Sequence, residues 1–308
     1  MTMKRLLLTL AIVMLSCSAF AQTQAKLYDT FHEAISRYDI DGAAAVIDKW
    51  EKAYPGDAEI FALQANYHFQ KAINEEIVLS DTEPDDGREY LLTKDSLGVQ
   101  RYLYSEIRIN STELKAAQAA LTEGTLNHPD RLDLRLGKIT VHLYVNEHDL
   151  AVQEVKSALE RSLKNQNRWT DTLDEPIETD GVSYLRECIQ DYLSKLIEAD
   201  DLASAERMID DCIKSYSKDA VFLTDKGVLR FYADDLKGAL KWFRKANRIA
   251  PDDMLITANI ANIYEKMGNR KKALKYYGII AESDDEEFAE IAKSAIQELT
   301  HQTADTQN

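Results

Sequence analysis

Two cysteines are the residues with the most distinctive chemistry in the interior of the chain. Cys188 and Cys212 fall near the start of one predicted helix and near the end of the next. An antiparallel helix pair would bring them together, and in an oxidising compartment they could form a disulfide. Unpaired cysteine is also a common small buried residue, so two thiols in the core are the alternative.

The other polar clusters lack the spacing of a catalytic or metal site. The six histidines include no pair one helical turn apart and no HExxH motif, so zinc has no ligand set. The acidic stretch Asp81–Gly87 places its glycine one position too late for a calcium loop and has no closing glutamate. No glycine-rich phosphate loop or nucleophile elbow is present. We therefore predict a protein that is not an enzyme and has no cofactor or metal.

The composition predicts a folded, helical and acidic protein. The chain has 308 residues, of which 45% are hydrophobic, and a formal net charge of -16. Removing Lys4 and Arg5 with an export segment changes this charge to -18, which opposes binding to nucleic acid. With 11 Gly and 5 Pro, the chain has too few turn signals for an all-β sandwich.

The N-terminal segment resembles a secretory signal peptide. Lys4 and Arg5 precede an apolar run, which small residues follow up to Ala21, so residues 1–21 should be removed on export to the periplasm or the exterior. The alternative is an outer-membrane lipoprotein, because Met14–Cys17 resembles the box that precedes a lipid-bearing cysteine. The apolar run is too short to span a bilayer, and no later stretch approaches the length required of a transmembrane segment.

Residues in the C-terminal half recur at an interval of 34. Asp200 returns as Asp234, and Ala239 returns as Ala273. A period of 34 with helical spacing inside each unit predicts antiparallel helix pairs that stack into a solenoid.

Residues 220–253 resemble the tetratricopeptide repeat (TPR) family. Lys226 and Arg230 depart from the family, which has an apolar and an aromatic residue there. The resemblance implies an all-α, right-handed α-solenoid of antiparallel helix pairs. The residues that should pack these repeats are Gly227, Ala239, Phe243, Ala246, Pro251, Ala261, Tyr264, Ala273 and Tyr277.

The proline spacing divides the chain into repeats and insertions. The predicted segments are a signal peptide (1–21), N-terminal repeats (22–165) with a β-hairpin insertion at about 80–110, an irregular insertion (166–185), three repeats (186–287), a capping helix (286–300) and a tail (301–308). The apolar hairpin should pack over the helices, and Trp169 should anchor the acidic second insertion. Asp95–Leu97 and Asp171–Leu173 also resemble the short O-glycosylation pattern of secreted Bacteroidetes proteins.

The family resemblance implies a scaffold that binds a peptide or a partner helix in a groove lined by the first helix of each pair. The residues that match the groove positions are Asn66, Gln190, Ser194, Thr224, Val228, Phe231, Asn262 and Glu265. Some of these side chains could instead pack between neighbouring repeats. A glycan-binding or polysaccharide-utilisation accessory protein is the second hypothesis, with Tyr90, Tyr102, Tyr104 and Trp169 as stacking surfaces for sugars.

Overall fold

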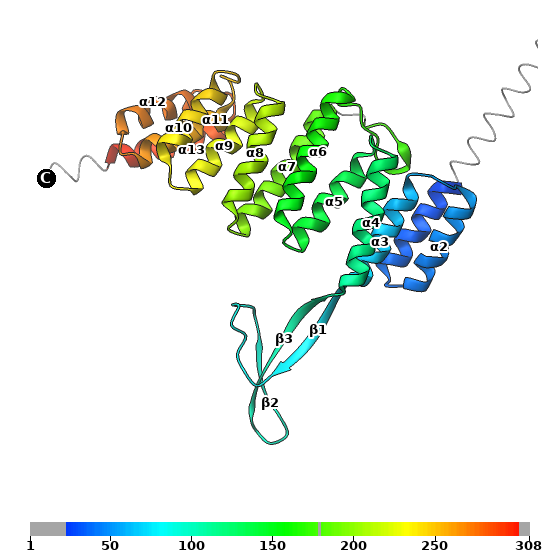
Figure 1. The fold of residues 1–308 in the computed structure, drawn as a ribbon. Helices are drawn as coiled ribbons and strands as arrows, with labels where there is room; N and C mark the ends of the chain where they lie inside the picture. Colours follow the sequence, from blue (N-terminus) through cyan, green and yellow to red (C-terminus); the bar gives the residue numbers. More distant parts are fainter. Residues whose placement is uncertain (1–22, 178–179, 302–308) are drawn as a thin grey trace, which may run out of the picture. The chain divides into compact units, whose positions relative to one another are not determined.

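The computed structural model describes residues 23–177 and 180–301, which form helices, one small sheet and an irregular segment between α6 and α7 (Figure 1). The predicted signal peptide, Cys17 and residues 302–308 of the predicted tail lie outside the described residues. Two compact units are present. Unit 1 holds the described residues up to Val141 and Arg168–Ile177, and unit 2 holds His142–Asn167 and residues 180–301.

Unit 1 contains helix pairs interrupted by strands. Residues 23–36 are helical, and within this unit Ala72 of α3 leads directly into β1. The elements that follow the first helix are α2 (Ile40–Ala53), α3 (Glu59–Ala72), β1 (Ile73–Ser80), β2 (Leu91–Lys94), β3 (Gln100–Ile109), α4 (Ser111–Asn127), α5 (Leu132–Tyr144), which crosses the unit boundary, and the 3-10 turn η1 (Thr172–Asp174).

Unit 2 is a run of helices. Its elements are α6 (His148–Lys164), α7 (Gly181–Glu198), α8 (Leu202–Ser215), α9 (Ala220–Tyr232), α10 (Leu236–Asn247), α11 (Met254–Lys266), α12 (Arg270–Ala281) and α13 (Glu286–His301). Since α7 begins at Gly181, its first turn lies inside the segment predicted to be irregular (166–185), and Asp180 caps this helix. The predicted α-solenoid packing of helix pairs is confirmed within the units, whereas its right-handed course stays a prediction.

The interval of 34 residues has a local cause in the turns between paired helices. Asp200, Asp234 and Gly268 all have a positive φ, between 56° and 68°. This left-handed conformation ends one helix, and the residue that follows caps the next. The side chains of Asp201 and Asp235 accept hydrogen bonds from backbone N–H groups in the first turns of α8 and α10. The repeated Asp-Asp pair therefore encodes the turn itself.

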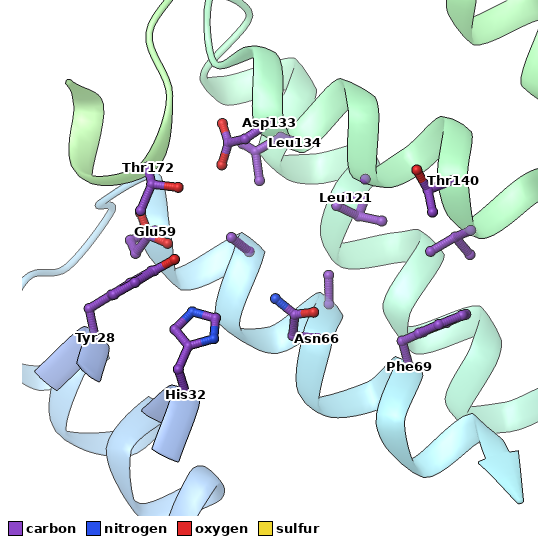
Figure 2. Close-up of a pocket in the computed structure, with 14 residues that line it drawn as sticks. Tyr28, His32, Glu59, Asn66, Phe69, Leu121, Asp133, Leu134, Thr140 and Thr172 are labelled. Carbon is purple, nitrogen blue, oxygen red and sulfur yellow. The ribbon is translucent and has the colours of Figure 1, made fainter. Parts of the chain in front are cut away.

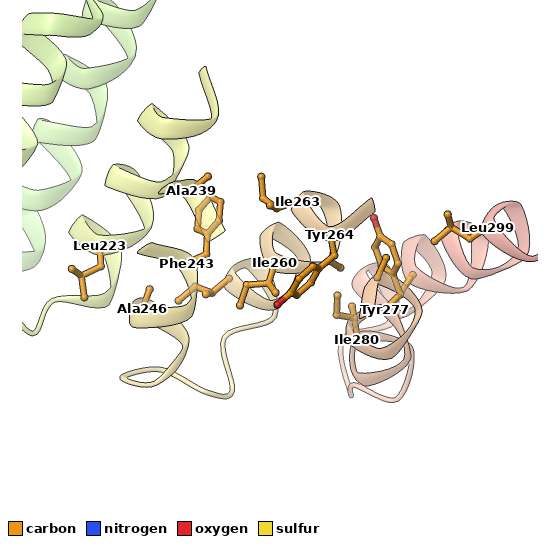
Figure 3. Close-up of a cluster of buried hydrophobic side chains, with 14 residues drawn as sticks. Leu223, Ala239, Phe243, Ala246, Ile260, Ile263, Tyr264, Tyr277, Ile280 and Leu299 are labelled. Atoms are coloured by element: carbon orange, nitrogen blue, oxygen red, sulfur yellow. The ribbon is translucent and has the colours of Figure 1, made fainter. Parts of the chain in front are cut away.

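Helices α9 to α13 of unit 2 share a continuous apolar core (Figure 3). A Cβ atom added to Gly227 would lie 2.6 Å from the Phe243 ring, so glycine allows α9 to approach α10 closely. Ala239, Ala246 and Ala273 have no exposed surface, and small residues at these positions keep the helices close. Among the predicted packing residues, Pro251 is the one on the surface, in the turn after α10. The others are buried, including Ala261, Tyr264 and Tyr277.

Lys226 and Arg230, which depart from the family pattern, join α9 to α8. Lys226 is 2% exposed, and its ammonium lies 2.7 Å from a carboxylate oxygen of Glu206 and 2.7 Å from one of Asp210. Arg230 also pairs with Glu206. A buried charge requires such partners, and α8 supplies them one turn apart. An ion-paired contact therefore replaces the apolar contact at this position.

The first insertion is a three-stranded antiparallel sheet in the order β1-β3-β2. The predicted hairpin corresponds to β2 and β3, with Gly98 at a positive φ of 77° in the turn between them. β1 continues directly from α3 and pairs with β3 from Ile73 opposite Ile109 to Ser80 opposite Tyr102. The insertion is therefore longer than the predicted range of about 80–110 and has a third strand.

The expectation that this insertion packs over the helices is wrong. Ile77, Leu79, Leu91 and Ile107 point to one face of the sheet by the observed register, and they are 55–71% exposed. The strands satisfy their backbone hydrogen bonds within the sheet, so the sheet needs no support from the helices for these groups. Its aliphatic face remains open to solvent.

Candidate functional site

A pocket lies on the first helices of the helix pairs of unit 1 (Figure 2). Residues 23–36, α3 and α5 form most of its wall, and single residues from α4 and η1 complete it. Its volume is about 330 Å³. Ligand pockets span roughly 300–1,000 Å³, so this one has room for one long side chain or a small molecule.

The two ends of the pocket differ in polarity. Phe69 and Leu121 lie toward one end, whereas Tyr28, Glu59 and Thr172 lie together at the other (Figure 2). The smaller residues Ala62, Ala65 and Gly137 leave the space between α3 and α5 open. The pocket therefore has an apolar wall and a polar end.

Arg131, which directly precedes α5, organises the polar end. It is 1% exposed, and its guanidinium donates to Glu59 at 3.0 Å, to Asp133 at 2.7 and 2.8 Å, and to Asp174 at 3.2 Å. Glu59 is also 1% exposed and accepts a second hydrogen bond from the Leu173 N–H at 2.8 Å. One cation thus holds together α3, α5 and η1, which are far apart in the sequence.

The second insertion is fastened to unit 1 by backbone contacts as well. The Thr170 N–H donates to the Asp130 carbonyl at 3.0 Å, and the Leu132 N–H donates to the Thr170 carbonyl at 2.9 Å. Trp169 is 3% exposed, in agreement with its predicted role as an anchor. Because a buried ring cannot stack on a sugar, its burial removes Trp169 from the aromatic surface of the glycan-binding hypothesis.

Burial and negative charge determine the protonation of the pocket residues. Burial raises the pKa of Glu59, against the opposing effects of the Leu173 N–H and Arg131. Burial also raises the pKa of Tyr28, and the nearby Glu59 and Asp133 carboxylates add to this shift. Burial lowers the pKa of His32, which favours the neutral imidazole at neutral pH. The polar end is therefore a negative environment beside a neutral histidine.

Of the predicted groove residues, Asn66 lines this pocket, on α3. The other seven belong to unit 2. Ser194, Asn262 and Glu265 are exposed there, and Val228 and Phe231 pack partly against the apolar core. The structure thus brings one predicted groove residue into the pocket.

Two of the predicted groove residues have interior contacts. Thr224 is 8% exposed, and its hydroxyl donates to the Ala220 carbonyl at 2.8 Å, so it belongs to the interior of the stack and not to a binding surface. Gln190 donates its amide N–H to Asp225 at 3.2 Å, which joins α7 to α9. Gln190 thus joins neighbouring repeats, as the alternative interpretation holds, whereas the hydrogen bond of Thr224 stays within α9.

The disulfide that the sequence left possible is absent, since no bond joins Cys188 and Cys212. Cys212 lies on the core face of α8 with Met208 and Ile209, and burial raises the pKa of its thiol, whereas Cys188 is only partly buried. Within the described residues, no group of three or more His, Cys, Asp or Glu side chains is placed to hold a metal ion.

Sequence reasoning missed Glu59 and Arg131, which define the polar end. The sequence did contain a signal, because both charged residues stand next to apolar residues. Glu59 stands between Ala58 and Ile60, which are both buried, and Arg131 precedes the buried Leu132. Two opposite charges in apolar surroundings indicate a buried ion pair, but their separation of 72 residues hides which one pairs with which.

No family model and no curated protein matches the sequence. Several solved structures resemble its fold. These neighbours include tetratricopeptide repeat proteins. One, from Parabacteroides merdae, is 12% identical over 91% of this chain and 88% of its own, with a TM-score of 0.38. YrrB, a TPR protein with an unusual peptide-binding site, is 17% identical over 59% of this chain and 84% of its own, with a TM-score of 0.37.

The type IV pilus biogenesis factor PilW is 12% identical over 88% of this chain and 98% of its own, with a TM-score of 0.40. These likenesses concern the fold alone. No helix within residues 23–177 and 180–301 is both long and apolar enough to cross a membrane.

Proposed function

We propose that this protein is a non-catalytic interaction scaffold that binds an extended peptide segment or a partner helix along its first helices. The observation that carries the proposal is the pocket on residues 23–36, α3 and α5, with the exposed Asn66 at its wall. Concave sites with an apolar wall and a few polar groups are the usual form of a binding site. An asparagine side chain both donates and accepts hydrogen bonds, as recognition of a peptide backbone requires.

Peptide selection tests this proposal. Random dodecapeptides displayed on phage are selected on immobilised residues 22–308, and the enriched peptides are measured by fluorescence anisotropy. Asn66→Trp places a large ring in the pocket and should weaken binding at least tenfold. Asn262→Trp is the matched control, because Asn262 is also an exposed asparagine on a first helix.

The Asn262→Trp control shows whether binding depends on the pocket or on another part of the protein. Equal binding by wild type and Asn66→Trp, with weakened binding by Asn262→Trp, would move the site to unit 2 and refute the assignment to the pocket. Failure to enrich any peptide would refute peptide binding altogether. Unchanged thermal unfolding of both variants is required, and it is expected because both positions are exposed.

Export is a separate proposal that concerns residues outside the described part of the chain. We propose that the signal peptide is removed after Ala21 and that the protein acts in the periplasm or outside the cell. Mass spectrometry of the mature N-terminus tests this. A chain that begins at Gln22 is the expected result, whereas a diacylglyceryl mass on Cys17 would establish an outer-membrane lipoprotein instead.

A further inference from the structure

Glu59 has one carboxylate oxygen that is still available at the pocket. Both of its hydrogen bonds, from Arg131 and from the Leu173 N–H, go to Oε2. Within residues 23–177 and 180–301, no hydrogen bond reaches Oε1. The Glu59 side chain is 2% exposed and lines the cavity (Figure 2). An acceptor of a nearly buried carboxylate that has no protein partner favours a ligand that supplies a donor.

The local charge favours a cationic donor. Glu59, Asp133 and Asp174 surround the single guanidinium of Arg131, so three negative charges face one positive charge. His32 is on the same cavity wall, and burial disfavours its protonated form, so it does not offset the excess. A carboxylate or phosphate ligand would meet repulsion here, whereas an ammonium group would be attracted.

The rest of the cavity favours a ligand with a long aliphatic stem. Ala62, Ala65 and Leu134 line it beyond the polar end, and Phe69 and Leu121 continue the apolar wall. A methylene chain would bury its surface against these residues while its charged group reaches Glu59. The volume of about 330 Å³ is sufficient for such a chain.

We propose that the pocket binds a lysine side chain of the peptide segment, with its ammonium group at Glu59 Oε1 and its methylene stem along the apolar wall. This inference rests on the proposed function. Lysine fits better than arginine because Glu59 Oε2 already accepts two hydrogen bonds, so Glu59 offers one oxygen and not the two that a forked guanidinium pairs with. The ligand class is therefore a primary amine on a flexible aliphatic chain.

The peptides selected on residues 22–308 are the probes for this inference. Each selected lysine is replaced in turn by norleucine, which keeps an aliphatic stem and removes the ammonium group, and by arginine. We expect one lysine whose replacement by norleucine weakens binding at least tenfold, and a smaller loss with arginine. A scrambled peptide of the same charge controls for general attraction to this acidic protein, and it should bind at least tenfold more weakly than the selected peptide.

A matched pair of protein variants locates the lysine site. Asn66→Lys introduces a competing ammonium group at the pocket and should weaken binding at least tenfold, while Asn262→Lys adds the same charge at an exposed position of unit 2 and should leave binding unchanged. Equal binding of the lysine and norleucine peptides would overturn the inference and leave peptide binding intact. Failure to select any peptide would instead remove the proposed function on which the inference rests.

Discussion

The two insertions of unit 1 meet the helices in opposite ways. The first is rich in aliphatic residues, yet its sheet leaves Ile77 71% and Leu91 69% exposed. The second is acidic and irregular, yet Trp169 is 3% exposed and Arg131 joins the segment to α3. Hydrophobic content alone therefore does not decide which insertion packs.

Backbone hydrogen bonding explains the difference. The strands of the first insertion pair with one another from Ile73 to Ile109, so they satisfy one another's polar groups. The irregular second insertion has no such ladder, and its N–H groups at Thr170 and Leu173 bind the Asp130 carbonyl and the Glu59 carboxylate. An irregular segment must use the protein to satisfy its backbone, and this requirement places Thr172 at the pocket.

Among the variants considered, removal of the Arg131 guanidinium should destabilise the protein most. Arg131→Met leaves Glu59 buried without a counter-ion and should lower the free energy of unfolding of unit 1 by about 3–5 kcal/mol. Hydrogen exchange at the amides of Thr170 and Leu173 should accelerate as the second insertion is released. Urea unfolding and amide exchange measure the two effects.

A double variant provides the control for this prediction. Arg131→Met with Glu59→Met removes the buried ion pair and should recover part of the lost stability, because an apolar pair of similar size replaces it at little cost, while Asp133 and the Leu173 N–H still lose their partners. A loss below about 1 kcal/mol in Arg131→Met, with unchanged exchange at Thr170, would show that Trp169 and the backbone hydrogen bonds of Thr170 hold the second insertion without Arg131.

Asp225 is a buried carboxylate with no ion pair in the described part of the chain, so removal of its charge should stabilise the protein, the opposite of the effect expected at Glu59. Asp225 in unit 2 accepts from Gln190, and its Oδ2 has no hydrogen-bond partner in the described structure. Burial, opposed by the Gln190 amide, raises the pKa of Asp225 to about 7, with nearby Asp219 adding to the shift and Arg186 opposing it. Asp225→Asn should therefore stabilise unit 2 at neutral pH, whereas removal of the charge of Glu59 by Glu59→Gln should destabilise unit 1.

The raised pKa of Asp225 makes the stability of unit 2 depend on pH. Between about pH 4 and pH 7 the folded state binds the Asp225 proton and the unfolded state does not, so the stability of unit 2 falls as the pH rises. The fall should reach about 2–4 kcal/mol and level off above pH 7, and Asp225→Asn should remove it. Thermal unfolding across this pH range gives the measurement, and an identical slope in the variant would contradict the assigned titration.

The sequence could predict the features of the regular repeats but not the long-range contacts of the insertions. The Asp-Asp turn pair and Gly227 are local features, because each is fixed by a turn or by the adjacent helix, and the periodic spacing exposes them. Arg131 and Glu59 depend on contacts across 72 residues, and a single sequence carries no periodic signal for such a pair. The repeats were therefore predictable, and the pocket was predictable only through Asn66.

Lys226 is a second buried cation, and its partners lie on the preceding helix, whereas Arg131 pairs with Glu59 72 residues away. Lys226 binds Glu206 and Asp210 from the preceding helix, and both carboxylates are partly exposed, with side-chain exposures of 36% and 46%. Lys226→Met leaves these carboxylates with access to water and places an apolar residue where the repeat family has one. The free energy of unfolding of unit 2 should change by no more than about 1 kcal/mol. A loss near that of Arg131→Met in a urea titration would show that the two cations are energetically alike.

The smallest effect should come from the exposed face of the sheet. Replacing Ile77, Leu79 and Ile107 together by threonine keeps residues that favour strands and removes aliphatic surface that contacts solvent. Because these side chains do not pack on the helices, the thermal unfolding of the helices should shift by no more than the equivalent of about 0.5 kcal/mol. A loss above about 2 kcal/mol would mean that the aliphatic face supports the helices, and both insertions would then be anchored by packing.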